Sequence, residues 1–355
     1  MLIDFVLYYV GGRGGVEEVT TKVVNGLIKR GHRVRVFLAS PPTYTSWVYS
    51  VPEMYFYALD YDLNSFGDYG YKYGIRYREM IEKMGAPDIV VATHQPVLSF
   101  MCEIALSKGR LKKIPIISWI HSPADMLGNR QLLNYSNTHM AISKDIAKDL
   151  SKWINPKDIY FVGNPITIKN IKQIERETSK LSMTFVGRIC AQKNLYTLFN
   201  ALNNLPGNWE LNIFGDGEQK NDLMRLATLY NISNKIKWLG WQEHPWDHIE
   251  KTSITVISSD FEGFSLTTAE SLARGIPVIS TACIGPASLI EDGINGWLYP
   301  VKDSNSLRNI LENILNHTYR LPTAEACIQS IQFYNEDAVI DRINKVITET
   351  YYKYN

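Results

Sequence analysis

Residues 254–280 combine a strand, a loop, a helix and a second strand in one short run, which restricts the chain to folds with a parallel sheet. Ile254–Ile257 is rich in β-branched residues, as is typical of a buried parallel strand, and Gly263 marks the loop that follows. A helix is predicted from about Thr267, because Thr267-x-x-Glu270 has the pattern of a capping box. In α/β sheets of this kind, ligands bind at the loops after the carboxyl ends of the strands.

The loop and the helix start are predicted to form an anion site. Backbone N–H groups at residues 264–267 point towards a ligand, and the positive end of the helix dipole lies behind them. Two carboxylates bracket this site, Glu262 and Glu270. Because carboxylates repel phosphate, we expect them to accept hydrogen bonds from hydroxyl groups, which indicates a sugar nucleotide. The alternative is a capping bond for Glu270 and a solvated loop position for Glu262, and this stretch alone does not decide between the two.

The same alternation of strand and helix runs through both halves of the chain. Residues 2–38 read as strand, glycine-rich turn, helix and strand, and the pattern restarts at residues 181–187, after a Gly-Asn-Pro turn. A chain of 355 residues can form two domains that each bury a core. We therefore predict an α/β protein with two Rossmann-like, doubly wound domains that face each other across a cleft. The predicted parts are residues 1–163, residues 164–336, and a C-terminal helix at residues 337–355 that packs back on the first domain.

The glycine-rich turn at residues 11–15 permits the backbone to approach a ligand closely. It is not the dinucleotide fingerprint, because Glu17 stands where the third glycine is required. An NAD-dependent or other nucleotide-binding protein of that kind is therefore disfavoured. A plain tight turn explains the glycines equally well.

Three further features have a functional and a structural interpretation. His121 follows a predicted strand, where a histidine can contact a ligand, but this position taken alone favours a structural histidine with one hydrogen-bonded nitrogen. Residues 40–74 are rich in aromatic side chains, which suit a sugar or a membrane surface but also the packing of an irregular segment. Asp60-Tyr61-Asp62 is formally a metal-binding D-x-D pattern, and we interpret it as a chance match.

Composition excludes several classes of protein. A net charge of +1 argues against a general nucleic-acid binder. No apolar run approaches the roughly 20 residues of a membrane span, and the first residues lack the features of a secretory signal. The four cysteines are scattered without pair spacing, so neither a disulfide framework nor a zinc site is indicated. We expect a cytosolic protein without a metal or a cofactor.

Taken together, the motifs of the second half resemble those of the retaining family 4 glycosyltransferases of the GT-B fold. The resemblance is carried by three patterns, Glu262-x7-Glu270, Gly187-Arg188-x4-Lys193 and Gly215-Asp216-Gly217. Residues 240–246 and 280–299 are similar to those of bacterial lipopolysaccharide-core enzymes of this family. By this resemblance, the first domain is the acceptor side and the second domain binds the nucleotide sugar.

The family implies roles for individual residues. Those assigned to catalysis are His121, Arg188, Lys193 and Glu262. Those assigned to the donor are Gly14, Gly15, Gly215, Leu239, Trp241, Phe264, Ser265, Leu266 and Glu270. Arg188 and Lys193 would pair with the diphosphate, Glu270 would bind the ribose hydroxyls, and Glu262 would hold the donor sugar.

The resemblance also implies the reaction. A hexose, galactose or glucose, would pass from a UDP-sugar to a hydroxyl of a bacterial surface glycan, such as the lipopolysaccharide core or a capsule or O-antigen precursor. The transfer would retain the anomeric configuration without a metal. The alternative from another class is a UDP-sugar 2-epimerase on the same fold, which would need further acid and base carboxylates.

A peripheral contact with the inner face of the cytoplasmic membrane is expected because acceptors in this family are often lipid-linked. Basic residues near one predicted helix end agree with an anionic surface, namely Lys108, Arg110, Lys112 and Lys113.

Overall fold

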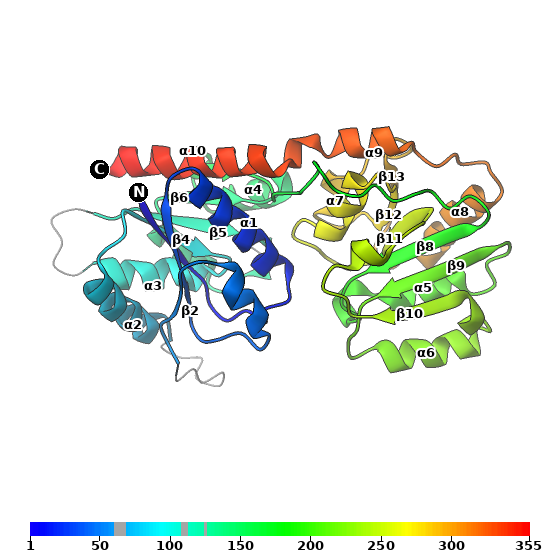
Figure 1. The fold of residues 1–355 in the computed structure, drawn as a ribbon, viewed down its shortest axis with the longest axis horizontal. Helices are drawn as coiled ribbons and strands as arrows, with labels where there is room; N and C mark the ends of the chain where they lie inside the picture. The colour runs from blue at the N-terminus through cyan, green and yellow to red at the C-terminus, as the bar shows by residue number, and fades with distance from the viewer. Residues whose placement is uncertain (60–68, 108–112, 124–125) are drawn as a thin grey trace. The chain divides into compact units, whose positions relative to one another are not determined.

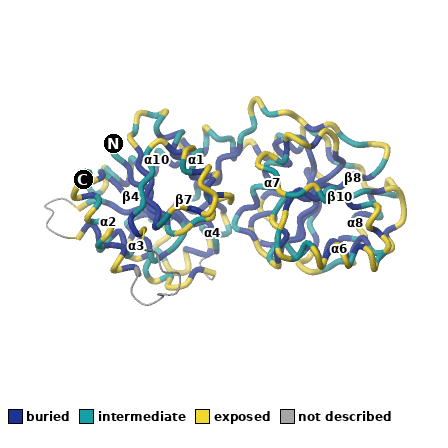
Figure 2. Tube along the Cα trace, turned by 60° about the horizontal axis from the view of Figure 1, so that its bottom comes forward, coloured by how far each residue is buried: buried dark blue, intermediate teal, exposed yellow. Residues whose placement is uncertain are grey.

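The computed structural model describes residues 1–59, 69–107, 113–123 and 126–355. The chain divides into two compact units. Unit 1 comprises Met1–Pro165 together with Glu336–Asn355, and unit 2 comprises Ile166–Asn335. Figure 2 shows the buried residues concentrated in the strands at the centre of each unit. The prediction of two Rossmann-like α/β domains is confirmed.

Unit 1 is built on a parallel sheet in the order β3-β2-β1-β4-β5-β6-β7. Its strands are β1 (Leu2–Val6), β2 (Arg33–Leu38), β3 (Met54–Phe56), β4 (Ile89–Thr93), β5 (Ile116–Ile120), β6 (Thr138–Ala141) and β7 (Ile159–Phe161). Its helices are α1 (Gly15–Lys29), α2 (Tyr69–Met84), α3 (Pro96–Leu106), α4 (Lys144–Leu150) and α10 (Glu336–Tyr354). Helices α2 and α3 cover one face of the sheet, and α1 and α10 cover the other (Figure 1).

Unit 2 is built on a parallel sheet in the order β10-β9-β8-β11-β12-β13. Its strands are β8 (Leu181–Val186), β9 (Trp209–Phe214), β10 (Ile236–Gly240), β11 (Ile254–Ile257), β12 (Val278–Thr281) and β13 (Gly296–Tyr299). Its helices are α5 (Leu195–Leu202), α6 (Lys220–Leu229), α7 (Leu266–Ala273), α8 (Ser304–Leu315) and α9 (Ala324–Ser330). The main core lies between the sheet and helices α5, α6 and α8.

Both sheets reverse their strand order beside their first strand. In unit 1 the reversal lies between β1 and β4, and in unit 2 it lies between β8 and β11. The crossover helices on the two sides of such a point leave the sheet on opposite faces, so the loops after the two central strands diverge. A ligand crevice is therefore expected at the carboxyl edge of each sheet, at this point.

The sequence pattern predicts a helix from residue 77, whereas α2 begins eight residues earlier, at Tyr69. Two glycines explain the difference. A Cβ atom at Gly74 would lie 2.8 Å from the backbone oxygen of Met101 on α3, and one at Gly70 would lie 3.0 Å from the side chain of Val97. The glycines therefore allow α2 and α3 to pack closely, and this packing outweighs the low helix propensity of glycine.

A fully buried ion pair between β1 and β2 connects the centre of the sheet in unit 1 with helix α2. Arg35 donates to both carboxylate oxygens of Asp4, at 2.7 and 2.8 Å, and Tyr77 donates to the same carboxylate at 2.7 Å. Burial raises the pKa of Asp4, while the hydrogen bonds and the charge of Arg35 oppose that effect. Each buried polar group is thus compensated by a partner on another element.

Helix α10 completes unit 1 from the far end of the sequence. It lies against α1 so closely that a Cβ atom at Gly26 would lie 2.3 Å from the side chain of Ile340. Arg30 and Asp341 form an ion pair at 2.7 Å across the same contact, and Thr350 on α10 donates to Thr138 on β6 at 3.1 Å.

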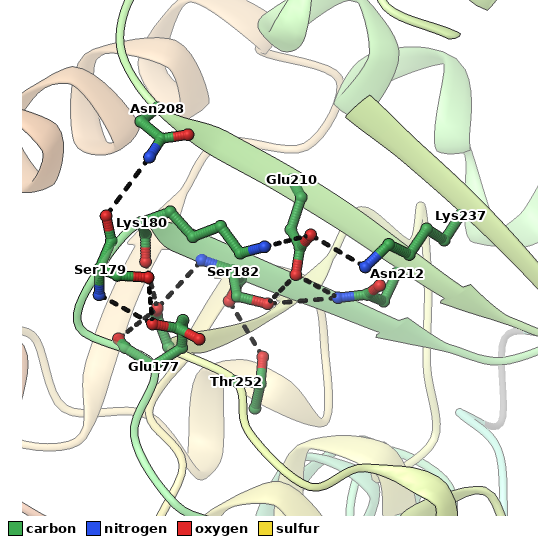
Figure 3. A network of polar contacts seen from close by, with 10 residues as sticks. Glu177, Ser179, Lys180, Ser182, Asn208, Glu210, Asn212, Lys237 and Thr252 are labelled. Carbon is green, nitrogen blue, oxygen red and sulfur yellow. Dashed lines mark hydrogen bonds and ion pairs between the residues drawn. The ribbon is translucent and has the colours of Figure 1, made fainter. Parts of the chain in front are cut away.

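A network of hydrogen bonds and ion pairs connects the amino ends of neighbouring strands in the sheet of unit 2 (Figure 3). Lys180 and Lys237 donate to one oxygen of Glu210 at 2.7 and 3.1 Å, and Ser182 donates to the other at 3.1 Å. Burial raises the pKa of Glu210, but these hydrogen bonds and one from Asn212 outweigh it and lower the pKa from 4.5 to about 2. The network lies at the edge opposite to the ligand crevice, so its role is structural.

The lowered pKa of Glu210 predicts a loss of stability in acid. The unfolded chain binds a proton at this side chain below about pH 4.5, whereas the folded chain binds it only near pH 2. The free energy of unfolding of the wild type should therefore fall as the pH drops from 4.5 to 2. Glu210→Gln, which cannot titrate, should show a smaller fall in urea denaturation over this range. Glu250→Gln, at an exposed position of the same unit, is the control and should follow the wild type. If the free energy of unfolding fell equally in all three proteins between pH 4.5 and pH 2, this role of Glu210 would be contradicted.

Candidate functional site

The candidate site of unit 2 is formed by the loops that follow β8 and β11, on either side of the strand-order reversal. These loops are joined to each other by hydrogen bonds. The backbone N–H of Asp260 donates to the oxygen of Gln192 at 2.9 Å, and the amide of Asn194 donates to the carboxylate of Asp260 at 2.6 Å. The amide of Gln192 donates to the backbone oxygen of Phe261 at 3.0 Å. Side chains from both loops are thereby held in place.

Lys193 and Glu262 contact each other in this site, a contact that was not predicted from the sequence. The ammonium group of Lys193 lies 2.5 Å from Oε1 of Glu262, and the hydroxyl of Ser259 donates to the same oxygen at 2.7 Å. Glu262 is only 8% exposed. Among the described residues, no hydrogen bond is made to its second oxygen, Oε2. A buried carboxylate with one oxygen fixed and the other open can accept a hydrogen bond from a hydroxyl group.

Arg188 lies in the loop after β8 and is exposed. Its guanidinium group forms no hydrogen bond or ion pair with any described part of the chain. An arginine in this state is a cation that an anionic ligand can engage without breaking an existing contact.

The start of α7 differs from the expected capping box. The helix begins at Leu266 and its N-cap is Ser265, whose φ of 70° is left-handed and whose side chain makes no capping bond. The prediction that Thr267 caps the helix is wrong, because Thr267 already belongs to the first turn and donates to the backbone oxygen of Val186 at 3.2 Å. The first N–H groups of a helix have no partner within the helix, so this end can receive an anion.

Glu270 is therefore not a capping residue. It lies in the second turn of α7, and its carboxylate accepts a hydrogen bond from the indole N–H of Trp246 at 2.8 Å. Trp246 is 6% exposed. Trp246 lies within the family-like stretch 240–246, but its contact with Glu270 was not predicted from the sequence.

Glycines bring the loop after β9 against the loop after β8. A Cβ atom at Gly215 would lie 1.9 Å from the backbone oxygen of Gly187, and one at Gly217 would lie 2.2 Å from that of Ile189. No other residue fits at these two positions without displacing a loop. At the end of the neighbouring β10, Leu239 and Trp241 are exposed, so an apolar surface adjoins the site. Phe264 is buried, and its ring packs edge-on against Tyr334 with the centroids 4.9 Å apart.

The glycine-rich turn of unit 1 leads directly into α1. Gly14 is the N-cap of α1, Gly15 is its first residue, and both are exposed. The carboxylate of Glu17 folds back and accepts a hydrogen bond from the N–H of Gly12 at 2.7 Å. Gly12 has a φ of 89°, and a Cβ atom there would lie 2.1 Å from the backbone oxygen of Tyr44. The tight-turn interpretation therefore explains Gly12, and the exposed Gly14 and Gly15 remain accessible to a ligand.

His121 follows β5 and is 7% exposed. Its ring lies 4.4 Å from that of Trp119 and 5.9 Å from that of His94, measured between centroids. Burial, and to a smaller extent the charge of His94, hold the pKa of His121 well below its usual value, so the imidazole is neutral near pH 7. His94 itself was missed by the sequence analysis, because it stands in an ordinary-looking loop after β4.

The aromatic residues of the segment 40–74 divide into two groups where the structure describes them. Trp47, Tyr57 and Tyr73 are buried and pack in unit 1, whereas Tyr49 and Tyr71 are exposed. Asp60, Tyr61 and Asp62 lie outside the described residues. Within the described ranges, no three His, Cys, Asp or Glu side chains are grouped so that they could hold a metal ion.

The fold and the site together define a class of protein. Two parallel-sheet Rossmann-like units are the architecture of the GT-B fold, and a lysine, a buried glutamate and a helix start lie together at the strand-order reversal of the second unit. Solved structures agree with this fold. The lipopolysaccharide outer core galactosyltransferase WaaB matches with a TM-score of 0.84 and 24% identity, over 98% of this chain and 99% of that chain. HepE from Anabaena, solved in complex with UDP, matches with a TM-score of 0.81 and 17% identity, over 98% of this chain and 100% of that chain.

Sequence comparisons identify the family. Residues 13–170 match the family model described as Glycosyltransferase Family 4, and residues 167–334 match the one described as Glycosyl transferases group 1. The lipopolysaccharide 1,6-galactosyltransferase of Escherichia coli K12 is 30% identical over 270 residues, which are 74% of each chain. Its counterpart in Salmonella typhimurium is 33% identical over 226 residues, 61% of this chain and 62% of that one. The chain belongs to glycosyltransferase family 4, and the predicted similarity to lipopolysaccharide-core enzymes, UDP-galactose:(glucosyl)lipopolysaccharide 1,6-galactosyltransferase among them, is confirmed.

No helix in the described part of the chain is long and apolar enough to cross a membrane.

The Lys193–Glu262 pair predicts a measurable coupling. Lys193→Met leaves a mostly buried carboxylate without its cation and should lower the melting temperature, and Glu262→Gln should lower it less because the amide carries no charge. In a double-mutant cycle by chemical denaturation, the coupling energy should be roughly 0.5–3 kcal/mol. Lys220→Met is the control, because its ion pair with Asp216 lies at the surface. Additive effects of Lys193→Met and Glu262→Gln would show that the contact contributes nothing.

Proposed function

We propose that this protein is a retaining glycosyltransferase that moves a hexose from a UDP-sugar to a hydroxyl of a bacterial surface glycan. The observation that carries the proposal is the convergence of Lys193, Glu262 and the start of α7 at the strand-order reversal of unit 2. The names of the relatives support the substrate class, because two are lipopolysaccharide 1,6-galactosyltransferases. The UDP-sugar epimerase alternative has no support, since both matched families are glycosyltransferases.

In this proposal, the donor binds to the groups that lie together in unit 2, and their contacts support the assignment of roles. Lys193 and the exposed Arg188 pair with the diphosphate, and the N–H groups at the start of α7 point at it. Glu270 binds the ribose hydroxyls, with its carboxylate oriented by the indole of Trp246. The open Oε2 of Glu262 accepts a hydrogen bond from the donor sugar. The base lies against the backbone near the exposed Leu239 and Trp241.

The same residues support the chemistry without a metal. Cleavage of the bond between sugar and diphosphate develops negative charge on the leaving phosphate, and two cations and a helix start stabilise that charge. Removing one preorganised group of this kind typically costs roughly 10²–10³-fold in rate. We infer that the acceptor attacks from the face that the diphosphate leaves and that a departing phosphate oxygen takes the acceptor's proton. Neither a cofactor nor a covalent sugar–enzyme intermediate enters this scheme.

We assign the acceptor to unit 1 and identify it by its chemical class. Relatives named for lipopolysaccharide and for a diphospho-undecaprenol-linked glycan point to a surface glycan or its lipid-linked precursor. In unit 1, His121 is the residue that we assign to the transferring sugar, as a neutral hydrogen-bonding group.

Donor binding is tested by isothermal titration calorimetry with UDP, UDP-galactose and UDP-glucose in EDTA. The wild type should bind without metal. Arg188→Gln should bind UDP about tenfold or more weakly, because it loses a charge-assisted contact with phosphate. It should melt at the wild-type temperature, because Arg188 is exposed and unpaired within the described chain. Arg225→Gln, an equally exposed change on α6, should bind as the wild type does.

Transfer itself is tested with truncated lipopolysaccharide as acceptor, and the product's anomeric configuration is read by NMR. An α-linked product from an α-linked donor supports retention, and a β-linked product refutes it. Activity that disappears in EDTA and returns with a divalent cation refutes metal independence. If the wild type binds none of the UDP compounds, or if Arg188→Gln binds them equally well, the assigned donor site is wrong.

We further propose that the protein acts in the cytoplasm at the inner face of the membrane. Of the four basic residues that suggested this, only Lys113 lies in the described chain, where it is exposed. Exposed lysines on and just after α4 add positive charge to unit 1, namely Lys144, Lys148 and Lys157. Each lysine near an anionic surface contributes about 1 kcal/mol at low salt. The protein should sediment with anionic vesicles at low salt, less so as Lys144→Gln/Lys148→Gln, and not with neutral vesicles. Equal sedimentation with both kinds of vesicle would contradict an electrostatic contact.

A further inference from the structure

A small cavity lies at the strand-order reversal of unit 1, at the carboxyl ends of β1 and β4. Its volume of about 50 Å³ is enough for one or two water-sized groups. One side is formed by the chain after β1, and the other by the chain after β4. Polar side chains line it from both sides, Tyr8 and Tyr9 from the first and Thr93, His94 and Gln95 from the second.

Two lining residues have buried polar atoms without a hydrogen-bond partner in the described chain, Oγ1 of Thr93 and Nδ1 of His94. Two more such atoms, Nε1 of Trp119 and Nε2 of His121, belong to the end of the neighbouring β5, where the His121 ring contacts that of His94. Thr93 is 1% exposed, so its hydroxyl is cut off from bulk water. Buried polar side chains in folded proteins are almost always paired, and four unpaired atoms at the ends of two neighbouring strands are unusual. They indicate that the partner comes from outside the chain.

The backbone at His94 is held in a conformation that side chains rarely adopt. Its φ is 77°, and its N–H donates to the backbone oxygen of Trp119 at 2.7 Å. This bond ties the end of β4 to β5 and brings the His94 ring edge-on to the His121 ring. Left-handed backbone costs free energy at a residue other than glycine, so the surrounding contacts must hold His94 in this conformation.

The lining of the cavity indicates an uncharged ligand. None of the described residues that line it is Lys, Arg, Asp or Glu. Burial lowers the pKa of His94 and of His121, so both rings are neutral near pH 7. A neutral imidazole and a threonine hydroxyl can each donate or accept, which suits a hydroxyl group and gives no attraction to a phosphate.

We propose that Thr93 and His94, together with His121, form a subsite for one hydroxyl group of a sugar substrate. This inference rests on the proposed function, since it assumes that sugars are the ligands. The hydroxyl group belongs either to the hexose of the donor or to the acceptor glycan, and the two sources have the same chemistry. Thr93 and His94 contact the hydroxyl, and His94 also fixes the position of the His121 ring.

The test is steady-state kinetics of Thr93→Val and His94→Asn. Valine keeps the shape of threonine and removes the unpaired hydroxyl, so the ligand-free protein should melt at or above the wild-type temperature. Its KM for the sugar substrate should nevertheless rise about two- to tenfold, because one hydrogen bond to the ligand is lost. Asparagine tolerates the left-handed backbone, so His94→Asn should remain folded and show a similar rise. Thr20→Val is the matched control, since Thr20 is also fully buried and unpaired but does not line the cavity.

The KM values for the donor and for the acceptor show which of the two substrates supplies the hydroxyl group. A raised KM for UDP-galactose or UDP-glucose, with unchanged affinity for UDP alone, assigns the subsite to the donor hexose. A raised KM for truncated lipopolysaccharide assigns it to the acceptor. Unchanged KM values in both variants, or a lower melting temperature of Thr93→Val with an unchanged KM, overturn the subsite. A wild type that transfers no hexose refutes the proposed function instead, so the two failures are distinguishable.

Discussion

The geometry of each unit depends on the point at which its parallel sheet reverses strand order. Parallel strands need crossover helices, and helices that leave on opposite faces separate the two loops at the reversal. Polar side chains can gather there because the strand ends supply a rigid base and the sheet's own hydrogen bonds end at that edge. In unit 2 this point holds Lys193 and Glu262, and in unit 1 it holds His94, whose ring contacts that of His121 at the end of the next strand, β5. The opposite edge of the sheet in unit 2 holds the Glu210 network, in which Lys180 and Lys237 are paired with Glu210.

The site of unit 2 combines groups that would repel one another if they acted on the same ligand atom. A phosphate is attracted by Lys193, Arg188 and a helix start, whereas Glu262 repels it. The structure resolves this conflict by pairing one oxygen of Glu262 with Lys193 and Ser259, which reduces the repulsion and leaves the other oxygen directed to a different partner. For the donor site that we propose, this arrangement is suited to a ligand that is anionic at one end and hydroxylated at the other.

The sequence predicted what depends on local pattern and missed what depends on contacts between distant elements. β-branched runs and glycine stops placed the central strands, but the contact between Lys193 and Glu262 was not predicted, because the two residues lie on loops far apart in the sequence. The beginning of α2 was missed because Gly70 and Gly74 disfavour a helix locally and are favourable only against α3. The capping box was wrong because Ser265 adopts left-handed backbone, which the Thr267-x-x-Glu270 spacing does not reveal. The Trp246–Glu270 bond and the contact between His94 and His121 join residues far apart in the sequence, so no single window of residues contains them.

The return of α10 to unit 1 has a consequence for biosynthesis. The chain leaves the ribosome from its N-terminus, so the strands of unit 1 emerge first, and the helix that covers α1 emerges only after all of unit 2. Unit 2 is continuous in sequence and can close its core as soon as it is synthesised. Until α10 has been synthesised and has packed on unit 1, the face of α1 around Gly26 stays exposed to solvent, because Ile340 covers that face in the folded protein. Synthesis of unit 1 thus begins first and is completed last. A nascent chain that stops before residue 336 lacks α10, and its incomplete unit 1 is open to chaperones and proteases.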